Sequence, residues 1–367
     1  MQAVRVSDVL SILAQLAPPA FQESYDNSGL LIGDSSMKIT GVLICLDVTQ
    51  DVLEECRKNK CNLIVSHHPI IFKPIRSLTE ATPGEKLIRR IIQSDIAVIA
   101  VHTNLDNSSL GINMALAGKL GLRQVKILEP KRGMLRKLVV FCPVDSAEVV
   151  REAIFSAGAG MIGNYDCCSF NTGGLGSFRA NSKASPYVGN KGKLHFENEV
   201  RIETIFPSFI ENRLIECIRK AHPYEEVAYD IYPLENAYPI AGSGVIGSLP
   251  EPLSPAKIKE LIRKKLKVQH LRSSAYSREA VRSIAICSGS GAFLIPSAWK
   301  SGADAFLTAD LKYHDFQMYD DQMLLIDAGH YETELIANEI LKDALTKKFP
   351  NFAVLSSKSA KNPVNYT

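Results

Sequence analysis

Four short polar segments of this chain contain the residue types that bind metal ions. Each follows directly after an apolar run typical of a buried strand, and together they supply histidines and carboxylates. The segments are Ser66-His67-His68-Pro69, His102-Thr103-Asn104-Leu105-Asp106, Thr308-Ala309-Asp310 and Gly329-His330-Tyr331-Glu332-Thr333-Glu334. In open α/β sheets the ligand crevice lies outside the carboxyl ends of the strands. We therefore expect side chains far apart in sequence to meet at one place.

The histidines and acids of these segments also have purely structural explanations. His67 and His68 are adjacent, and neighbouring side chains on a strand point to opposite faces, so the pair suits two metal ions better than one. His330 and Glu334 are four residues apart at a predicted helix start and share one side of it, although a carboxylate there also suits the helix dipole. Asp106 lies in a polar segment where it could be an ordinary turn residue. The convergence of the segments, rather than any one of them, favours a metal site.

This donor set indicates the kind of ion and the kind of reaction. Histidine with carboxylate and without thiolate suits Zn, Fe or Mn, and a shared carboxylate suits two ions about 3.5–4 Å apart. Two divalent ions can lower the pKa of bound water and generate hydroxide at neutral pH. Hydrolysis is the reaction class that follows most directly, and the sequence leaves the identity of the metal open.

Two further polar segments are weaker candidates. Cys287-Ser288-Gly289-Ser290-Gly291-Ala292 follows a predicted strand and opens a predicted helix, where backbone N–H groups could hold an anion. It lacks the spacing of a P-loop or of a dinucleotide fingerprint, so a tight strand-to-helix turn is the preferred interpretation. His222-Pro223-Tyr224-Glu225-Glu226 combines a histidine with two carboxylates, and we interpret it as a surface turn rather than a metal site.

The elements that must position the four segments alternate between strand and helix. Apolar β-branched runs and helical runs follow one another from about residue 38 to 125 and again from about 242 onward. Such alternation predicts βαβ units and a doubly wound, mostly parallel sheet of the α/β class. An insertion splits this module, which gives three parts: residues 1–127, the inserted residues 128–240, and residues 241–367.

The inserted segment has an element order of its own. After a basic, glycine-containing link at about 128–136, the pattern predicts strand, helix, strand, strand, helix and strand between residues 137 and 232. This β-α-β-β-α-β order is typical of the ferredoxin-like arrangement. The stretch from Gly173 to Lys193 is rich in Gly, Ser, Asn and Lys, and we expect a long hairpin arm or a mobile loop there.

Composition limits the partners and the compartment. The 367 residues carry 42 basic and 39 acidic side chains, a formal net charge of +3, which disfavours nucleic acid as the main partner. No run approaches the ~18 apolar residues that a membrane span requires. The eight cysteines form no CxxC pair and most lie in apolar runs, so we expect buried, reduced thiols and a cytoplasmic location.

Four motifs in a fixed order carry a family resemblance. Tyr25-Asp26-Asn27-Ser28-Gly29-Leu30-Leu31-Ile32-Gly33 and the three histidine-containing segments above resemble the Nif-three-like family, whose members are named GTP cyclohydrolase I type 2 homologues. The resemblance implies a two-metal site built from His67, His68, Asp106, His330 and Glu334. It also implies that the insertion is the PII-like or CutA-like domain of longer bacterial members, and that the protein is a homohexamer built as a trimer of dimers.

Three functional hypotheses follow, of which the first is preferred. The resemblance and the metal chemistry predict a metal-dependent hydrolase acting on a nucleotide-like small molecule such as GTP, with His102 or His314 transferring protons. The alternative is a metal-binding or metal-delivery protein whose inserted domain senses a small ligand or a partner. A third hypothesis, an adaptor for regulators of transcription, rests only on the family's original name.

Two expectations refine the preferred hypothesis. Tyr25-Asp26-Asn27 should support the site without binding metal, and His102 should act beside the ligands rather than as one of them. A cyclohydrolase should hold its triphosphate with several Lys or Arg groups or with backbone donors. The sequence shows no Walker motif and no dense arginine cluster beside the site motifs, so it does not reveal such a clamp.

Overall fold

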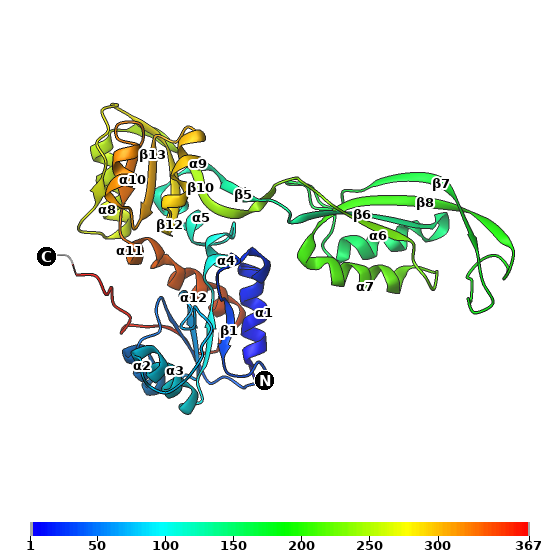
Figure 1. Cartoon of the computed structure of the whole chain (residues 1–367), viewed down its shortest axis with the longest axis horizontal. Helices are drawn as coiled ribbons and strands as arrows, with labels where there is room; N and C mark the ends of the chain where they lie inside the picture. Colours follow the sequence, from blue (N-terminus) through cyan, green and yellow to red (C-terminus); the bar gives the residue numbers. More distant parts are fainter. Residues whose placement is uncertain (1–2, 366–367) are drawn as a thin grey trace. The chain divides into compact units, whose positions relative to one another are not determined.

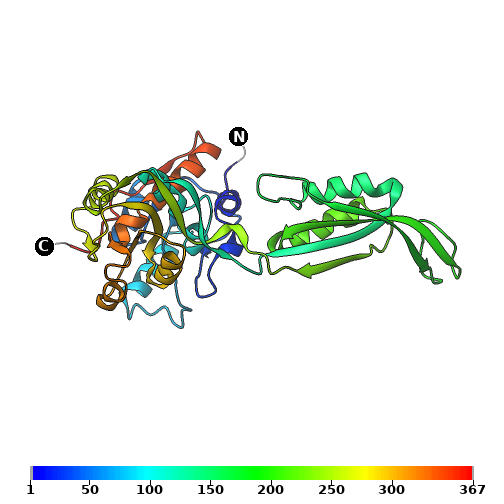
Figure 2. The same cartoon turned by 90° about the horizontal axis from the view of Figure 1, so that it is seen from above.

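A computed structural model describes residues 3–365 of the chain. The chain divides into two compact units (Figures 1 and 2). One is discontinuous and comprises Met1–Pro130 and Pro239–Thr367, and the other is Lys131–Tyr238. We call them the discontinuous unit and the inserted unit.

The first sheet of the discontinuous unit has five strands in the order β1-β4-β3-β2-β15. Their bounds are β1 Gly29–Ile32, β2 Val42–Cys45, β3 Leu63–Ser66, β4 Ala97–Ala100 and β15 Val354–Ser356. Strands β15, β2, β3 and β4 are parallel, and β1 lies antiparallel to β4 at the edge. Every residue of β2, β3 and β4 is buried, which explains why each strand is a continuous apolar run in the sequence.

The second sheet has six strands in the order β11-β14-β13-β12-β10-β5. Their bounds are β5 Arg123–Lys131, β10 Tyr238–Leu253, β11 Arg272–Ser273, β12 Val281–Ser290, β13 Ala305–Ala309 and β14 Leu324–Asp327. Strands β12, β13 and β14 are parallel, while β10 and β11 pair antiparallel with β12 and β14. The sheet is therefore parallel at its centre.

Helices cover both sheets, and one core cluster joins them. The α-helices of this unit are α1 Val6–Leu16, α2 Gln50–Lys58, α3 Pro83–Gln93, α4 Thr103–Asp106, α5 Ile112–Leu120, α8 Pro255–Leu266, α9 Ile295–Lys300, α10 Tyr313–Met318, α11 His330–Glu334 and α12 Ile336–Lys348. The largest cluster of buried apolar side chains draws on strands of both sheets and on α1, α5, α8 and α12. Helix α12 contacts α1, α5 and β2. Within residues 3–365, no helix is long and apolar enough to cross a membrane.

The two sheets differ from the single doubly wound sheet that the sequence predicts. The alternation of strands and helices is present, but its first half forms the sheet around β3 and its second half the sheet around β13. Residues 123–131, which overlap the start of the link predicted at about 128–136, form strand β5. Hydrophobic periodicity reports only which face of an element is buried, and not which strands are hydrogen-bonded to one another.

The inserted unit is built on one antiparallel four-stranded sheet in the order β7-β8-β6-β9. Its elements are β6 Leu135–Pro143, α6 Ala147–Ser156, β7 Phe170–Arg179, β8 Leu194–Pro207, α7 Glu211–Ala221 and β9 Tyr229–Pro233. Apolar side chains from the sheet and from both helices form its core. The stretch 173–193 is a hairpin whose strands pair as far as Arg179 and Leu194, which leaves residues 180–193 as the loop.

Candidate metal centre

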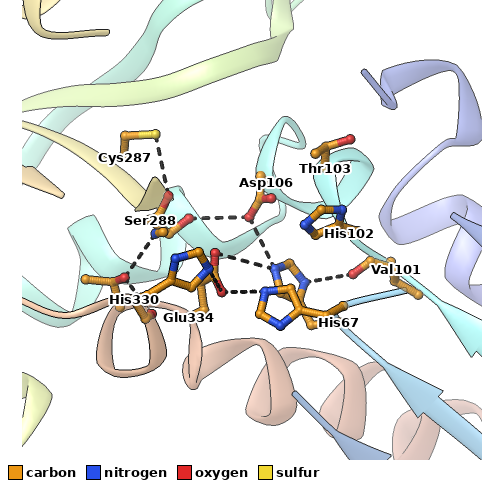
Figure 3. Close-up of polar contacts among 12 residues, drawn as sticks. His67, Val101, His102, Thr103, Asp106, Cys287, Ser288, His330 and Glu334 are labelled. Atoms are coloured by element: carbon orange, nitrogen blue, oxygen red, sulfur yellow. Dashed lines mark hydrogen bonds and ion pairs between the residues drawn. The ribbon is translucent and has the colours of Figure 1, made fainter. Parts of the chain in front are cut away.

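Three strands of the discontinuous unit deliver the predicted residues to one cluster (Figure 3). His67 and His68 follow directly after β3, and His102 follows β4 and precedes α4, which ends at Asp106. His330 and Glu334 are the first and last residues of α11, after β14. The cluster thus joins the carboxyl ends of strands from both sheets, as the strand-end argument predicted.

Glu334 lies at the centre of this cluster. Its Oε2 atom is 2.9 Å from Nε2 of His68 and 3.0 Å from Nε2 of His330, whereas its Oε1 atom is 3.8 Å from Nε2 of His67. Asp106 adds a second carboxylate, with Oδ1 3.9 Å from Nε2 of His67. The two oxygens of Glu334 therefore face different histidines.

Two groups of side chains that could hold a metal ion share Glu334. One consists of His67, Asp106 and Glu334, and the other of His68, His330 and Glu334; within each group the ligand atoms lie within 4.8 Å of one another. A third such group consists of His67, His68 and His102, so the geometry also brings His102 within reach of a cation. The two groups that share Glu334 thus define two neighbouring positions for a cation, with the Glu334 carboxylate common to both.

The short helix α11 explains how His330 and Glu334 come together. Gly329 precedes the helix with φ of 90°, a conformation that side chains with a Cβ rarely adopt, and the chain turns sharply there after β14. His330 and Glu334 are then one helical turn apart on the same side. The hydroxyl of Thr333 accepts a hydrogen bond of 3.0 Å from the N–H of Gly289 on β12, which fixes α11 against the second sheet.

The outward-facing ring nitrogen of each histidine has an acceptor. The pairs are His67 Nδ1 with the Val101 carbonyl (2.8 Å), His68 Nδ1 with Asp47 Oδ1 (2.8 Å), His102 Nδ1 with Asp26 Oδ1 (2.7 Å) and His330 Nδ1 with Asp310 Oδ2 (2.7 Å). Such acceptors place the proton on Nδ1 and leave Nε2 free to bind a cation. Metal-binding histidines in proteins almost always have such a partner.

His67 shows most directly that the donor set fits a cation. Its side chain is completely buried, and its Nε2 atom has no hydrogen-bond partner. Buried polar atoms are almost always satisfied in folded proteins. The Nε2 atom of His67 lies 3.9 Å from a carboxylate oxygen of Asp106 and 3.8 Å from one of Glu334. This spacing leaves room for an ion between the imidazole and the two carboxylates, which are donors of the type that such ions prefer.

Without a cation, protons balance the charge of the buried carboxylate. Burial opposes a charge on Glu334, but hydrogen bonds from His330 and His68 and the nearby charge of His67 hold its pKa well below the ordinary value. Burial likewise disfavours charge on His68, yet Asp47 and Glu334 raise its pKa to about 10. Glu334 is the main cause that raises the pKa of His330 to about 9. A divalent cation would replace these protons as the partner of Glu334.

Asp26 supports the site from outside. Its Oδ1 atom accepts from His102, and its Oδ2 atom accepts from the N–H and the hydroxyl of Thr103 at 3.0 and 2.5 Å. These bonds, with the charge of His102, lower the pKa of Asp26 despite its burial. Asp26 thus fixes the turn between β4 and α4 on which His102 lies.

The glycine-containing segment that begins at Cys287 leads from β12 into a helical turn at Ala292–Leu294, as predicted, and it also packs against the cluster. Strand β12 continues through Ser290, and a Cβ at Gly289 would lie 2.0 Å from Oε1 of Glu334. The hydroxyl of Ser288 lies 3.3 Å from Oδ1 of Asp106. Gly289 is therefore needed because the Glu334 carboxylate packs against its backbone.

Asp47 was not predicted as a residue of the site, and Asp310 was predicted only as part of its segment. Both residues follow strand ends, β2 and β13 respectively, so the strand-end rule that located the histidines could also have located them. His314, an alternative proton donor, is exposed on α10 with Nδ1 3.2 Å from Gln317 Oε1, and it belongs to none of the three groups.

Cavities border the cluster on two sides. One of about 480 Å³ is lined by His68 and His330 together with Arg272, Tyr331 and Asn362. Another of about 190 Å³ reaches His102, Asp106 and Glu334. Small molecules could therefore approach the cluster. A set of ion pairs with only a structural role would not need such access.

Comparison with known proteins identifies the family. The family model for Duf34/NIF3 (NGG1p interacting factor 3) matches residues 4–363. The chain belongs to the Duf34/NIF3 family. A Bacillus subtilis (strain 168) relative of this family, named GTP cyclohydrolase 1 type 2 homolog, is 36% identical over 351 residues, which are 95% of this chain and 92% of the relative. A relative of the same name from Staphylococcus aureus (strain MSSA476) is 34% identical over 347 residues, or 94% of each chain.

Solved structures agree with this membership. The crystal structure of a Bacillus cereus protein related to NIF3 matches with a TM-score of 0.88 and 34% sequence identity, and the match covers 100% of both chains. A Staphylococcus aureus protein matches with a TM-score of 0.80 and 31% identity, again over 100% of both chains. The NIF3 fold therefore extends over the whole chain, including the inserted unit.

Proposed function

We propose that this NIF3 protein holds two divalent metal ions and uses them to hydrolyse a nucleotide-like small molecule. The observation that carries the proposal is the Glu334 carboxylate, whose two oxygens face different histidines within two overlapping groups of donors. The proposed ligands are His67, His68, Asp106, His330 and Glu334, and the ions would be Zn, Fe or Mn. When bound, such ions supply hydroxide from water at neutral pH.

The remaining residues of the site then have separate roles. His102 has its Nδ1 atom fixed by Asp26 and lines the smaller cavity, so we assign it to proton transfer between substrate and solvent. Asp47 and Asp310 orient His68 and His330. Replacing His102 with Gln should therefore lower turnover and leave the bound metal in place.

The names of the relatives suggest GTP as the first substrate to test. Metal-loaded protein would be incubated with GTP and a panel of nucleotides, and products would be separated by chromatography, with Glu334→Gln as the inactive control. Turnover that disappears in the variant supports the hydrolase. The absence of turnover for every nucleotide in a fully metal-loaded preparation contradicts it.

One observation favours the second candidate, metal delivery. Among the described residues that line the two cavities, Arg272 is the only lysine or arginine, and its guanidinium pairs with Asp327. A triphosphate would normally be held by several cationic groups or backbone donors. If the protein delivers metal, it should transfer its ions to an acceptor chelator within minutes and show no turnover.

We extend the proposal to the inserted unit and to the assembly. The sheet order β7-β8-β6-β9 and the order β-α-β-β-α-β suggest a ferredoxin-like, PII-like or CutA-like domain. Family membership suggests a cytoplasmic homohexamer arranged as a trimer of dimers. Light scattering of the purified protein would test the assembly, since a mass near six times 40.3 kDa is expected.

A further inference from the structure

The inserted unit contains a cavity of about 280 Å³ with aromatic walls. Phe178 on β7, Tyr187 in the hairpin loop and Tyr224 after α7 line it. The ring centroids of Phe178 and Tyr224 are 6.0 Å apart at 60°, and those of Tyr187 and Tyr224 are 6.1 Å apart at 49°. The rings are inclined to one another rather than stacked, so they form walls around a space instead of filling it.

The same cavity is acidic. Glu199, Glu225 and Glu226 line it, and no lysine or arginine does. Among residues 3–365, none of the three carboxylates forms a salt bridge with a lysine or arginine. Their charge is therefore not neutralised by a neighbouring basic side chain.

The hairpin loop 180–193 is held over this cavity. The N–H of Gly192 donates to the carbonyl of Ala180 at 2.7 Å, which closes the loop at its base. The N–H of Ser185 donates to Oε1 of Glu225 at 2.7 Å, which ties the loop to the segment after α7. The segment predicted as a hairpin arm or a mobile loop is therefore fixed at both of these points, and it brings Tyr187 to the cavity.

Tyr224 also brings a polar group to this cavity. Its hydroxyl is buried, and the carboxylate of Glu199 interacts with it. Burial is the main cause that raises the pKa of this phenol, and the charge of Glu199 and a hydrogen bond with it raise the pKa further, so the phenol stays protonated. The phenol and the Glu199 carboxylate therefore add polar groups to the aromatic walls.

We propose that this cavity binds a small organic cation with an alkylated ammonium group. The negative faces of aromatic rings attract such cations, and enclosure by several rings is the usual way in which proteins recognise quaternary ammonium groups. The three carboxylates add long-range attraction and exclude anions. The ammonium group could belong to a free small molecule or to a methylated lysine of a peptide.

Titration calorimetry on the full-length protein tests the charge requirement. Choline is the probe, and 3,3-dimethylbutan-1-ol, which has the same shape without the charge, is the matched control. We expect choline to bind at least 10-fold more tightly than the neutral alcohol, and more weakly as salt is added. Equal binding of the two compounds, or no binding of choline or of a trimethyllysine peptide at millimolar concentration, would overturn the proposal.

Variants place the binding in this cavity and distinguish the sources. Tyr187→Ala removes a ring that is 62% exposed, so the fold should tolerate it, and Glu199→Gln removes one charge. Each should weaken choline binding roughly 5- to 30-fold, whereas Glu216→Gln on the exposed face of α7 should leave it unchanged. Unaltered binding in both cavity variants would refute the site. Tighter binding of a trimethyllysine peptide than of choline would identify a peptide ligand, and the reverse would identify a free amine.

Discussion

The Nε2 atom of His68 lies 2.9 Å from Oε2 of Glu334, while the other oxygen of the same carboxylate faces His67 at 3.8 Å. The neighbouring residues His67 and His68 thus approach different oxygens of the same buried carboxylate. They can do so because neighbouring side chains at a strand end point in different directions. For the same reason, an adjacent histidine pair is poor evidence for a single ion. It is the feature from which the two-metal proposal follows.

Gly289→Ala should displace Glu334 and lower metal affinity. A Cβ there would lie 2.0 Å from Oε1 of Glu334, so the carboxylate must move. Gly302→Ala is the matched control, because Gly302 also has a positive φ but its Cβ would meet no atom within 4 Å. Both variants should lose about 1 kcal/mol of stability from backbone strain. Only Gly289→Ala should lose metal in equilibrium dialysis; equal metal content in the two variants would show that Glu334 does not bind the ions.

Asp26→Asn should destabilise the protein without removing metal. The amide would turn an N–H₂ group toward the N–H donor of Thr103 or toward His102, and a buried unsatisfied pair of this kind costs about 1–3 kcal/mol. Asp34→Asn, at an exposed carboxylate that accepts from the N–H of Ser36, should change stability by less than about 0.5 kcal/mol. Urea unfolding with parallel metal analysis tests this. Metal loss at unchanged stability would instead make Asp26 a ligand.

Asp47→Ala and Asp310→Ala should weaken metal binding without abolishing it. Each removes the acceptor that fixes one imidazole, His68 or His330, and such acceptors typically contribute about 10- to 100-fold in affinity. Competition against a chelator of known affinity measures the change. A complete loss of both ions in either variant would indicate that the carboxylate itself is a ligand.

Metal uptake should release protons and become tighter as the pH rises. In the metal-free protein the pKa of His68 is about 10 and that of His330 about 9, so both are protonated at neutral pH and must lose a proton to bind a cation. Titration calorimetry at pH 7 in buffers of different ionisation enthalpy gives the number of protons released. A value of zero would contradict the charge balance that we assign to the cluster.

The free energy of unfolding of the metal-free protein should fall as the pH rises, whereas metal binding becomes tighter. The folded-state pKa of both histidines lies above the unfolded value near 6.5, so their contribution is complete below about pH 6.5 and is lost as the pH rises through about 9 to 10. Thermal unfolding in the presence of a chelator, compared with the metal-loaded protein, tests this. A metal-free protein that becomes more stable between pH 6.5 and 9 would contradict it.

The residues of the cluster could be recognised in the sequence because they are concentrated at strand ends. His67, His68, His102, His330 and Glu334 all follow buried apolar runs, and that pattern is local enough to be recognised in one chain. That Glu334 faces three histidines at once was not predictable, because it depends on how the strand ends of the two sheets come together. The resemblance supplied the proposed ligand set, which the residue pattern alone had left open.

The order of the fold's elements could be predicted, but their pairing into sheets could not. The alternation of helices and strands could be predicted, and α2 and α8 show why, since capping residues and amphipathic spacing coincide in both helices. The division into two sheets and the strand at 123–131 were missed. Strand β5 has mostly exposed or half-buried residues, so it carries no apolar run to reveal it.

Metal content per chain tests the central claim most directly. The wild-type protein would be purified without chelator or nickel affinity and analysed by plasma mass spectrometry beside Glu334→Gln, with Glu339→Gln on the exposed face of α12 as the control. We predict about two divalent ions in the wild type and in the control, and fewer than one in Glu334→Gln, since both positions share that carboxylate. A wild-type protein without metal, or a Glu334→Gln variant that keeps both ions, would contradict the account.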